Sequence, residues 1–128
     1  MTYLIDTHTL LWIVTDNPRL SKKVKSLYLN PANRMFVSIA CLWEITIKVS
    51  LKKLTIPGSV SDFVTDHVQG NDMRLLDITR HHLAVLEHLP WHHRDPFDRL
   101  LACQAMHEKA ALLSEDAEFD RYPIARIW

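Results

Sequence analysis

The sequence is poor in glycine and cysteine, and it has neither a long hydrophobic run nor an excess of charge. Only two of its 128 residues are glycine, and we find no repeat, linker or low-complexity segment. The two cysteines, Cys41 and Cys103, lack the spacing of a disulfide framework or a CxxC motif. We therefore expect residues 1–128 to form one domain whose thiols stay reduced, as they do in the cytoplasm.

The absence of a long apolar run and of excess charge restricts the classes of partner that the protein is expected to bind. No apolar run approaches the roughly 20 residues that span a bilayer, and the N-terminus lacks the basic and apolar regions of a signal peptide. Lys plus Arg and Asp plus Glu both total 15, so the formal net charge is zero and nothing global indicates nucleic-acid binding. We expect a cytoplasmic protein with no membrane partner, which would have to bind any polyanion through a local patch.

Short apolar runs alternate with amphipathic segments along the chain. Runs such as 3–5 and 111–113 are typical of strands buried in a parallel sheet, and apolar residues at helical spacing follow them. The predicted strands are 3–5, 35–37, 74–78, 111–113 and 123–127. The predicted helices are 7–14, 20–29, 39–54, 61–68, 81–89 and 96–109. This alternation predicts a doubly wound α/β fold with a largely parallel sheet covered on both faces.

Four carboxylates lie near the ends of predicted strands, where ligands bind in open α/β sheets: Asp6, Glu44, Asp98 and Asp116. Such a cluster repels itself unless a cation occupies it. Oxygen donors without cysteine or clustered histidine favour Mg²⁺ or Mn²⁺ over Zn²⁺. An ion held by carboxylates supplies an activated water and neutralises a phosphodiester, so the pattern indicates phosphodiester hydrolysis.

Each acid also has a purely structural explanation. Asp6 can cap the helix that follows it, and Glu44 with Lys48 forms an ordinary i, i+4 pair. Asp95 and Asp98 fit the cap and first turn around Pro96, and Asp116 fits the acidic first turn of a helix capped by Ser114. These explanations hold for single acids, whereas the metal-site hypothesis explains why they share one end of the sheet.

Four motifs carry a resemblance to a known family: LIDTHTLLW, VSIACLWEITIKVSLKKL, HRDPFDRLLACQA and LLSEDAEFDRYP. Together they resemble PIN-domain proteins, and specifically the VapC-type ribonuclease toxins of bacterial toxin–antitoxin modules. The resemblance implies a three-layer α/β/α sandwich with a five-stranded, mainly parallel sheet. It also implies metal-dependent endonucleolytic cleavage of single-stranded RNA, a homodimer, and neutralisation by a small antitoxin.

Carried over by motif, the catalytic and metal-binding acids of the family fall on Asp6, Glu44, Asp98 and Asp116, with Ser114 at the hydroxyl position. Asp98 is preferred to Asp95 because it stands before the Leu-Leu-Ala segment, whereas Asp95 directly precedes a proline. Asp120 is a further candidate. We hypothesise that Asp6 and Asp98 hold a Mg²⁺ or Mn²⁺ ion most directly, and that Glu44 and Asp116 act through water.

Other residues are weaker candidates for binding RNA. Ser114, His8, Arg99 and the run 92–94 are candidate substrate contacts, although a structural role for His8 is equally compatible with the sequence. Lys48, Lys52 and Lys53 more simply form a solvated face, and Trp43 is expected in the core or in a dimer interface.

Alternative functions stay open at this point. An RNA-processing nuclease outside a toxin system and a non-catalytic module that binds RNA or protein both fit the same motifs. A response-regulator receiver fits poorly, as does a haloacid-dehalogenase-type phosphatase, which would have a second Asp where His8 stands.

Overall fold

A five-stranded parallel sheet forms the centre of the computed structural model, which describes all of residues 1–128. The strand order is β3-β2-β1-β4-β5, and every neighbouring pair is parallel. Ile5 pairs with Val37 on one side and with Leu113 on the other, so three strands end at the same edge. The strands are β1 (Thr2–Ile5), β2 (Arg34–Ser38), β3 (Arg74–Leu76), β4 (Ala111–Leu113) and β5 (Arg126–Ile127).

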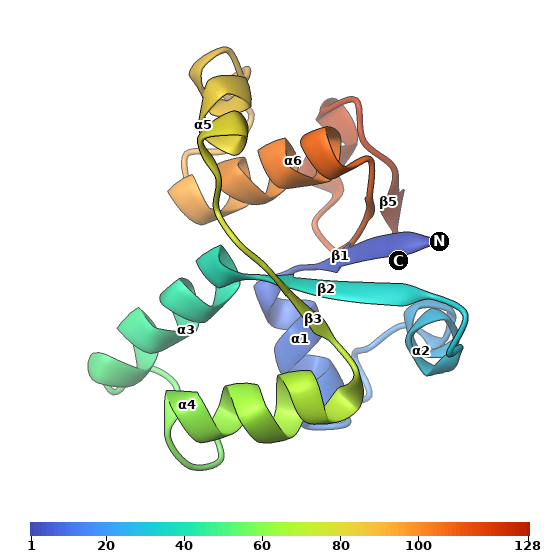
Figure 1. Ribbon diagram of the computed structural model, residues 1–128, viewed down its shortest axis with the longest axis vertical. Helices are drawn as coiled ribbons and strands as arrows, with labels where there is room; N and C mark the ends of the chain where they lie inside the picture. Colours follow the sequence, from blue (N-terminus) through green and yellow to red (C-terminus); the bar gives the residue numbers. More distant parts are fainter.

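Helices cover both faces of this sheet, which confirms the predicted α/β/α sandwich. In Figure 1, α5 and α6 lie on one side of the sheet and α1, α2 and α4 lie on the other. The helices are α1 (Thr7–Val14), α2 (Lys22–Leu29), α3 (Ile39–Ser50), α4 (Val60–Phe63), α5 (Arg80–Glu87) and α6 (Pro96–Glu108). Two single turns follow α4, a π turn (Val64–Val68) and a 3-10 turn (Gln69–Asn71), and a 3-10 turn (Ala117–Arg121) precedes β5. None of the helices combines the length and the apolar character needed to cross a membrane.

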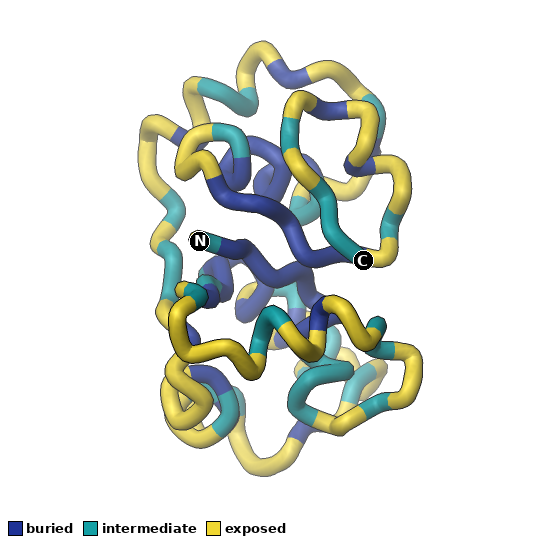
Figure 2. The backbone as a smooth tube through the Cα atoms, turned by 90° about the vertical axis from the view of Figure 1, so that its right-hand side faces the viewer, coloured by how far each residue is buried: buried dark blue, intermediate teal, exposed yellow.

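The core follows the central strands. Leu4 and Ile5 of β1 and Leu112 and Leu113 of β4 have no exposed surface, as expected for strands covered on both faces. Figure 2 shows these buried strands running through the middle of the molecule, with exposed loops around them. Both cysteines are buried and unpaired, and burial raises the pKa of Cys41 to about 12, so this thiol stays protonated.

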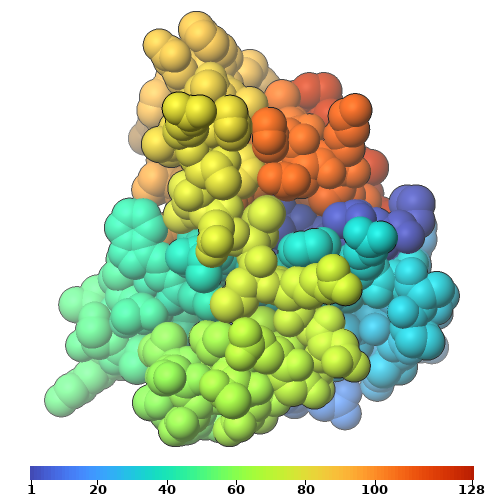
Figure 3. Space-filling model, viewed as in Figure 1, coloured from blue at the N-terminus to red at the C-terminus, as the bar shows by residue number.

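The predicted elements differ from the structure mainly at their ends. The helix predicted over 39–54 ends at Ser50, because Lys52 takes a left-handed conformation with φ 57° and turns the chain. Figure 3 shows this end of α3 standing out from the body at the left edge. Of the two places expected for Trp43, the core is wrong, since 56% of its surface is exposed, and the dimer interface stays a prediction; its ring makes an edge contact with Phe97. The last strand covers Arg126–Ile127 alone.

Candidate active site

Asp6 lies at the carboxyl end of β1, where it also caps α1. Its Oδ1 accepts a hydrogen bond from the backbone N–H of Thr9 at 2.9 Å, so the predicted cap is confirmed. Burial raises the pKa of Asp6, and hydrogen bonds from Ser114 and Thr9 oppose this rise. Ser114 is itself fully buried after β4, and its hydroxyl accepts a hydrogen bond from the N–H of Asp116. The hydroxyl predicted to contact substrate therefore lies between two of the acids.

Asp98 lies in the first turn of α6. Asp95 caps this helix by accepting from the N–H groups of Phe97 and Asp98, and Pro96 takes the first helical position, as predicted. Burial raises the pKa of Asp98 to about 7; the carboxylates of Asp95, Glu44 and Asp116 add to the rise, while His93 opposes it. Burial and the neighbouring carboxylates therefore make ionisation of Asp98 unusually costly.

Asp116 and Asp98 form a close group with a histidine. One donor atom from each of His93, Asp98 and Asp116 lies within 4.8 Å of the others. His93 Nε2 lies 2.8 Å from Asp116 Oδ2, and the second oxygen of Asp116 accepts the N–H of Glu118 at 3.0 Å. Asp116 thus caps the turn before β5, a role that had been predicted for Ser114.

Glu44 approaches the group from α3. Its Oε1 accepts the hydroxyl of Thr7 at 2.6 Å, and its Oε2 pairs with Lys48 at 3.1 Å, which confirms the predicted i, i+4 pair. Neither Glu44 nor Asp6 belongs to the close group of three. The hydrogen bond from Thr7 nevertheless connects Glu44 to the residue that follows Asp6, which is Thr7 itself. The predicted acids thus share one end of the sheet, with Asp98 and Asp116 in closest proximity.

The charges in this cluster are largely uncompensated. Asp6 and Asp98 form no salt bridge, and the only salt-bridge partner of Asp116 is His93. Buried carboxylates without a basic partner are costly unless a cation binds them. The donor set consists of carboxylate oxygens with one imidazole, which suits a hard divalent cation. These residues therefore fit such an ion.

A family model also covers these residues. The PIN domain model matches residues 3–125, which is nearly the whole chain. The chain belongs to the PIN domain family. No curated protein sequence matches it.

Solved structures resemble this PIN domain along its full length. VapBC2 from Rickettsia felis, bound to a promoter DNA fragment, matches with a TM-score of 0.71 and 19% identity, covering 100% of this chain and 99% of that chain. DNA-bound VapBC from Salmonella typhimurium matches with a TM-score of 0.71 and 18% identity, covering 99% and 97%. A toxin–antitoxin complex from Klebsiella pneumoniae matches with a TM-score of 0.66 and 12% identity, covering 98% and 96%. At these identities the likeness establishes the fold.

Residues predicted to contact substrate divide into two groups in the PIN domain. His8 is exposed and lines an open cavity of about 420 Å³ with Asp6, Trp12, Arg19 and Asp116 among its lining residues. Arg19 lies over the ring of Trp12 at 4.7 Å from its centroid. This cavity adjoins the acids and contains both aromatic and basic side chains.

Arg99 belongs to the second group. It is buried, donates to the carbonyls of Leu89 and Pro90, and lies 3.6 Å from the ring centroid of Trp91. Its guanidinium therefore holds the loop between α5 and α6. Asp120, the further acid candidate, instead forms two hydrogen bonds with Arg126 at 2.8 and 2.9 Å.

The sequence did not reveal the role of His93 and Tyr122. His93 had been a candidate phosphate contact, yet it is buried, and its Nδ1 lies 2.9 Å from the hydroxyl of Tyr122. Its position two residues before the cap of α6 is a signal that could have placed it at the edge where the acids lie. Tyr122 follows the last motif acid and had no such signal.

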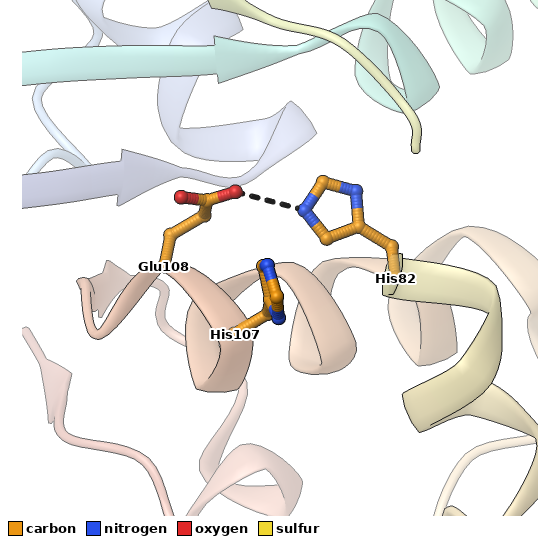
Figure 4. Close-up of side chains that lie close together, drawn as sticks. All are labelled: His82, His107 and Glu108. Atoms are coloured by element: carbon orange, nitrogen blue, oxygen red, sulfur yellow. Dashed lines mark hydrogen bonds and ion pairs between the residues drawn. The ribbon is translucent and has the colours of Figure 1, made fainter. Parts of the chain in front are cut away.

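A second histidine–carboxylate group lies between α5 and α6 and comprises His82, His107 and Glu108 (Figure 4). His82 Nδ1 accepts the N–H of Thr79 at 3.0 Å, so the neutral ring carries its proton on Nε2 and donates to Glu108 at 3.0 Å. No lone pair of His82 is then free for a metal. This group ties the two helices together.

Proposed function

We propose that this PIN domain is an endoribonuclease that uses Mg²⁺ or Mn²⁺ to hydrolyse phosphodiester bonds in single-stranded RNA. The observation that carries the proposal is the close approach of Asp98 and Asp116, neither of which has a Lys or Arg partner, at a place where ionisation of Asp98 is costly. Family membership supports a nuclease, and the carboxylate donors support a hard divalent cation. We infer that the domain works in the cytoplasm.

The residues have distinct roles in this proposal. Asp6 and Asp98 would hold the ion most directly, and Glu44 and Asp116 would ligate it through water or orient the water that attacks phosphorus. When bound, a divalent ion of this class lowers the pKa of a coordinated water and neutralises charge on the phosphodiester. Ser114 holds Asp6 and the Asp116 backbone in place through its hydroxyl.

The substrate enters through the cavity beside Asp6 and Asp116. His8 and Arg19 supply polar and cationic contacts for phosphate, and Trp12 supplies an aromatic surface close to them. Single-stranded RNA suits such a site, because its bases are free to contact aromatic and guanidinium groups. The lining also contains Glu115, which pairs with Arg19 at 3.7 Å, so the bound divalent ion would have to supply further positive charge for the phosphodiester.

We further propose that the domain is the toxin of a toxin–antitoxin pair and that it forms a homodimer. The support comes from its similarity to structures described as VapBC and toxin–antitoxin complexes. A small protein encoded by the neighbouring gene would then bind the domain and inhibit cleavage.

Cleavage of a single-stranded RNA by the purified protein tests the catalytic proposal. We expect cleavage with Mg²⁺ or Mn²⁺ and none with EDTA. Asp6→Asn and Asp98→Asn should each lower the rate by roughly 10²–10³-fold, because a charged donor to the ion is lost. Glu108→Gln is the matched control, since Glu108 belongs to the second histidine–carboxylate group, and it should cleave like the wild type. Metal-dependent cleavage that survives both Asp variants contradicts the assignment.

A further inference from the structure

The loop between α5 and α6 brings His93 into contact with the acids. His93 has only 9% of its surface exposed, and its ring packs against Phe119 at 4.5 Å and parallel to Tyr122 at 5.6 Å between centroids. Arg99 fixes the start of the same loop through the carbonyls of Leu89 and Pro90. The imidazole is therefore held in one position by side chains from the loop, α6 and the turn before β5.

Both ring nitrogens of His93 are engaged, and their partners define the direction of the hydrogen bonds. An ionised Asp116 carboxylate can only accept, so Nε2 carries the proton that points to Oδ2 at 2.8 Å. The Nδ1 of the neutral ring is then an acceptor, and the Tyr122 hydroxyl donates to it at 2.9 Å. A directed chain runs from Tyr122 through His93 to Asp116.

Asp116 needs such a partner more than the other acids do. Its side chain is 42% exposed, and it lies on a turn outside the sheet. The turn holds Oδ1 through the N–H of Glu118, and His93 holds Oδ2. Together the two contacts fix the plane of the carboxylate, and with it the directions of its remaining lone pairs, close to Asp98.

We propose that His93, supported by Tyr122, is a positioning residue that orients the Asp116 carboxylate toward the divalent cation of the active site. This inference rests on the proposed function and adds a residue outside the four acids. Hydrogen-bond partners of ligating carboxylates commonly contribute roughly 10- to 100-fold in metal affinity. Hard cations prefer oxygen, and Nε2 already donates to Asp116, so His93 acts through Asp116 instead of binding the ion itself.

The test measures Mn²⁺ binding to the full chain without RNA, by calorimetry and electron paramagnetic resonance. His93→Leu should weaken Mn²⁺ binding roughly 10- to 100-fold, and His93→Gln, whose amide can still donate to Asp116, should recover part of the loss. Tyr122→Phe removes the hydroxyl that holds Nδ1 and should weaken binding by a smaller factor. Because His93→Leu can disturb folding, His93→Gln and Tyr122→Phe test the hydrogen bonds from Tyr122 through His93 to Asp116 in structures closer to the wild type.

His82→Leu is the matched control. It removes another buried histidine that donates to a carboxylate, and it should leave Mn²⁺ affinity unchanged. Wild-type affinity in both His93→Leu and Tyr122→Phe overturns the inference. Nitrogen coupling to bound Mn²⁺ in electron spin echo experiments, lost in His93→Leu, also overturns it, because His93 would then be a ligand.

The two proposals fail in different ways in this design. If the wild type binds Mn²⁺ and the variants weaken binding as expected, the positioning role holds even where no RNA is cleaved. If RNA cleavage depends on Mg²⁺ but the His93 variants keep full affinity, the nuclease proposal holds and the positioning role is wrong. A wild type that binds no Mn²⁺ contradicts both.

Discussion

Two buried histidines in this PIN domain hold carboxylates in nearly the same way. His82 lies 3.0 Å from Glu108 and His93 lies 2.8 Å from Asp116, in both cases through Nε2. In both rings Nδ1 has its own partner, the backbone N–H of Thr79 in one and the hydroxyl of Tyr122 in the other. The local geometry of the two pairs does not distinguish a structural group from an active site.

The surroundings of the carboxylate make the difference. Glu108 stands at the end of α6 beside His82 and His107, and it lines a cavity of about 240 Å³ together with Arg34. Asp116 lies beside Asp98 and lines the same cavity as His8. Burial and neighbouring carboxylates raise the pKa of Asp98. Both carboxylates line a cavity, so the second carboxylate beside Asp116 is what marks the functional pair, and each pair can be changed separately.

The largest effect on stability is expected at the structural pair. His82→Leu removes a fully buried ring that donates to Glu108 and accepts from the N–H of Thr79, so it should lower the free energy of unfolding by about 2–3 kcal/mol. Urea denaturation measures this. Glu108→Gln, whose carbonyl can still accept from Nε2, is the control and should cost well under 1 kcal/mol. Equal losses in the two variants would contradict the assigned direction of the hydrogen bond.

Because of Asp98, which lies beside the active-site pair, the stability of the fold should depend on pH in the opposite sense from that given by a carboxylate in an ordinary ion pair. Asp98 has a pKa of about 7 in the folded chain, whereas in the unfolded chain its pKa returns to the usual 3.8. Between these values the folded state binds more protons, so the free energy of unfolding falls as pH rises. Without metal, we expect the wild type to melt at a higher temperature at pH 5 than at pH 8.

Asp98→Asn isolates this contribution. The neutral amide avoids the cost of ionisation, so at pH 8 the metal-free variant should melt roughly 2–5 °C above the wild type. Saturating Mg²⁺ should reverse the order, because the ion compensates the charge in the wild type alone. Calorimetry with EDTA and with Mg²⁺ measures both. A metal-free variant that melts below the wild type at pH 8 would mean that Asp98 is stabilised as an anion.

The sequence predicted the sheet, and with it the positions of the acids that follow β1 and β4, because both leave strong patterns. Apolar runs identified five strands, and acids after β1 and β4 necessarily share one edge, since parallel strands end together. The end of α3 was missed because apolar spacing continues through Leu51, although the chain turns at Lys52. Apolar periodicity predicts which residues face the core, but it does not predict where a residue in a left-handed conformation ends a helix.

The partners of the acids could not be predicted in the same way. Tyr122 meets His93 only because the turn before β5 folds back on the loop before α6, and no spacing in the chain encodes that approach. Arg99 follows Asp98 and was therefore a candidate phosphate contact beside the acids, yet its guanidinium donates to loop carbonyls. Contacts between loops depend on tertiary packing, whereas positions at strand ends follow from topology.

The smallest expected effect concerns the cavity beside Asp116. Arg19→Ala should raise KM for single-stranded RNA roughly 3- to 10-fold with little change in kcat, because one phosphate contact is lost away from the reacting atoms. The slope of log affinity against log salt should fall by about 0.7, the value for one phosphate contact on a single strand. Stability should barely change, since the ion pair with Glu115 is exposed. Arg74→Ala, at the amino end of β3, is the control, and an equal change in KM there would mean that RNA does not use this cavity in particular.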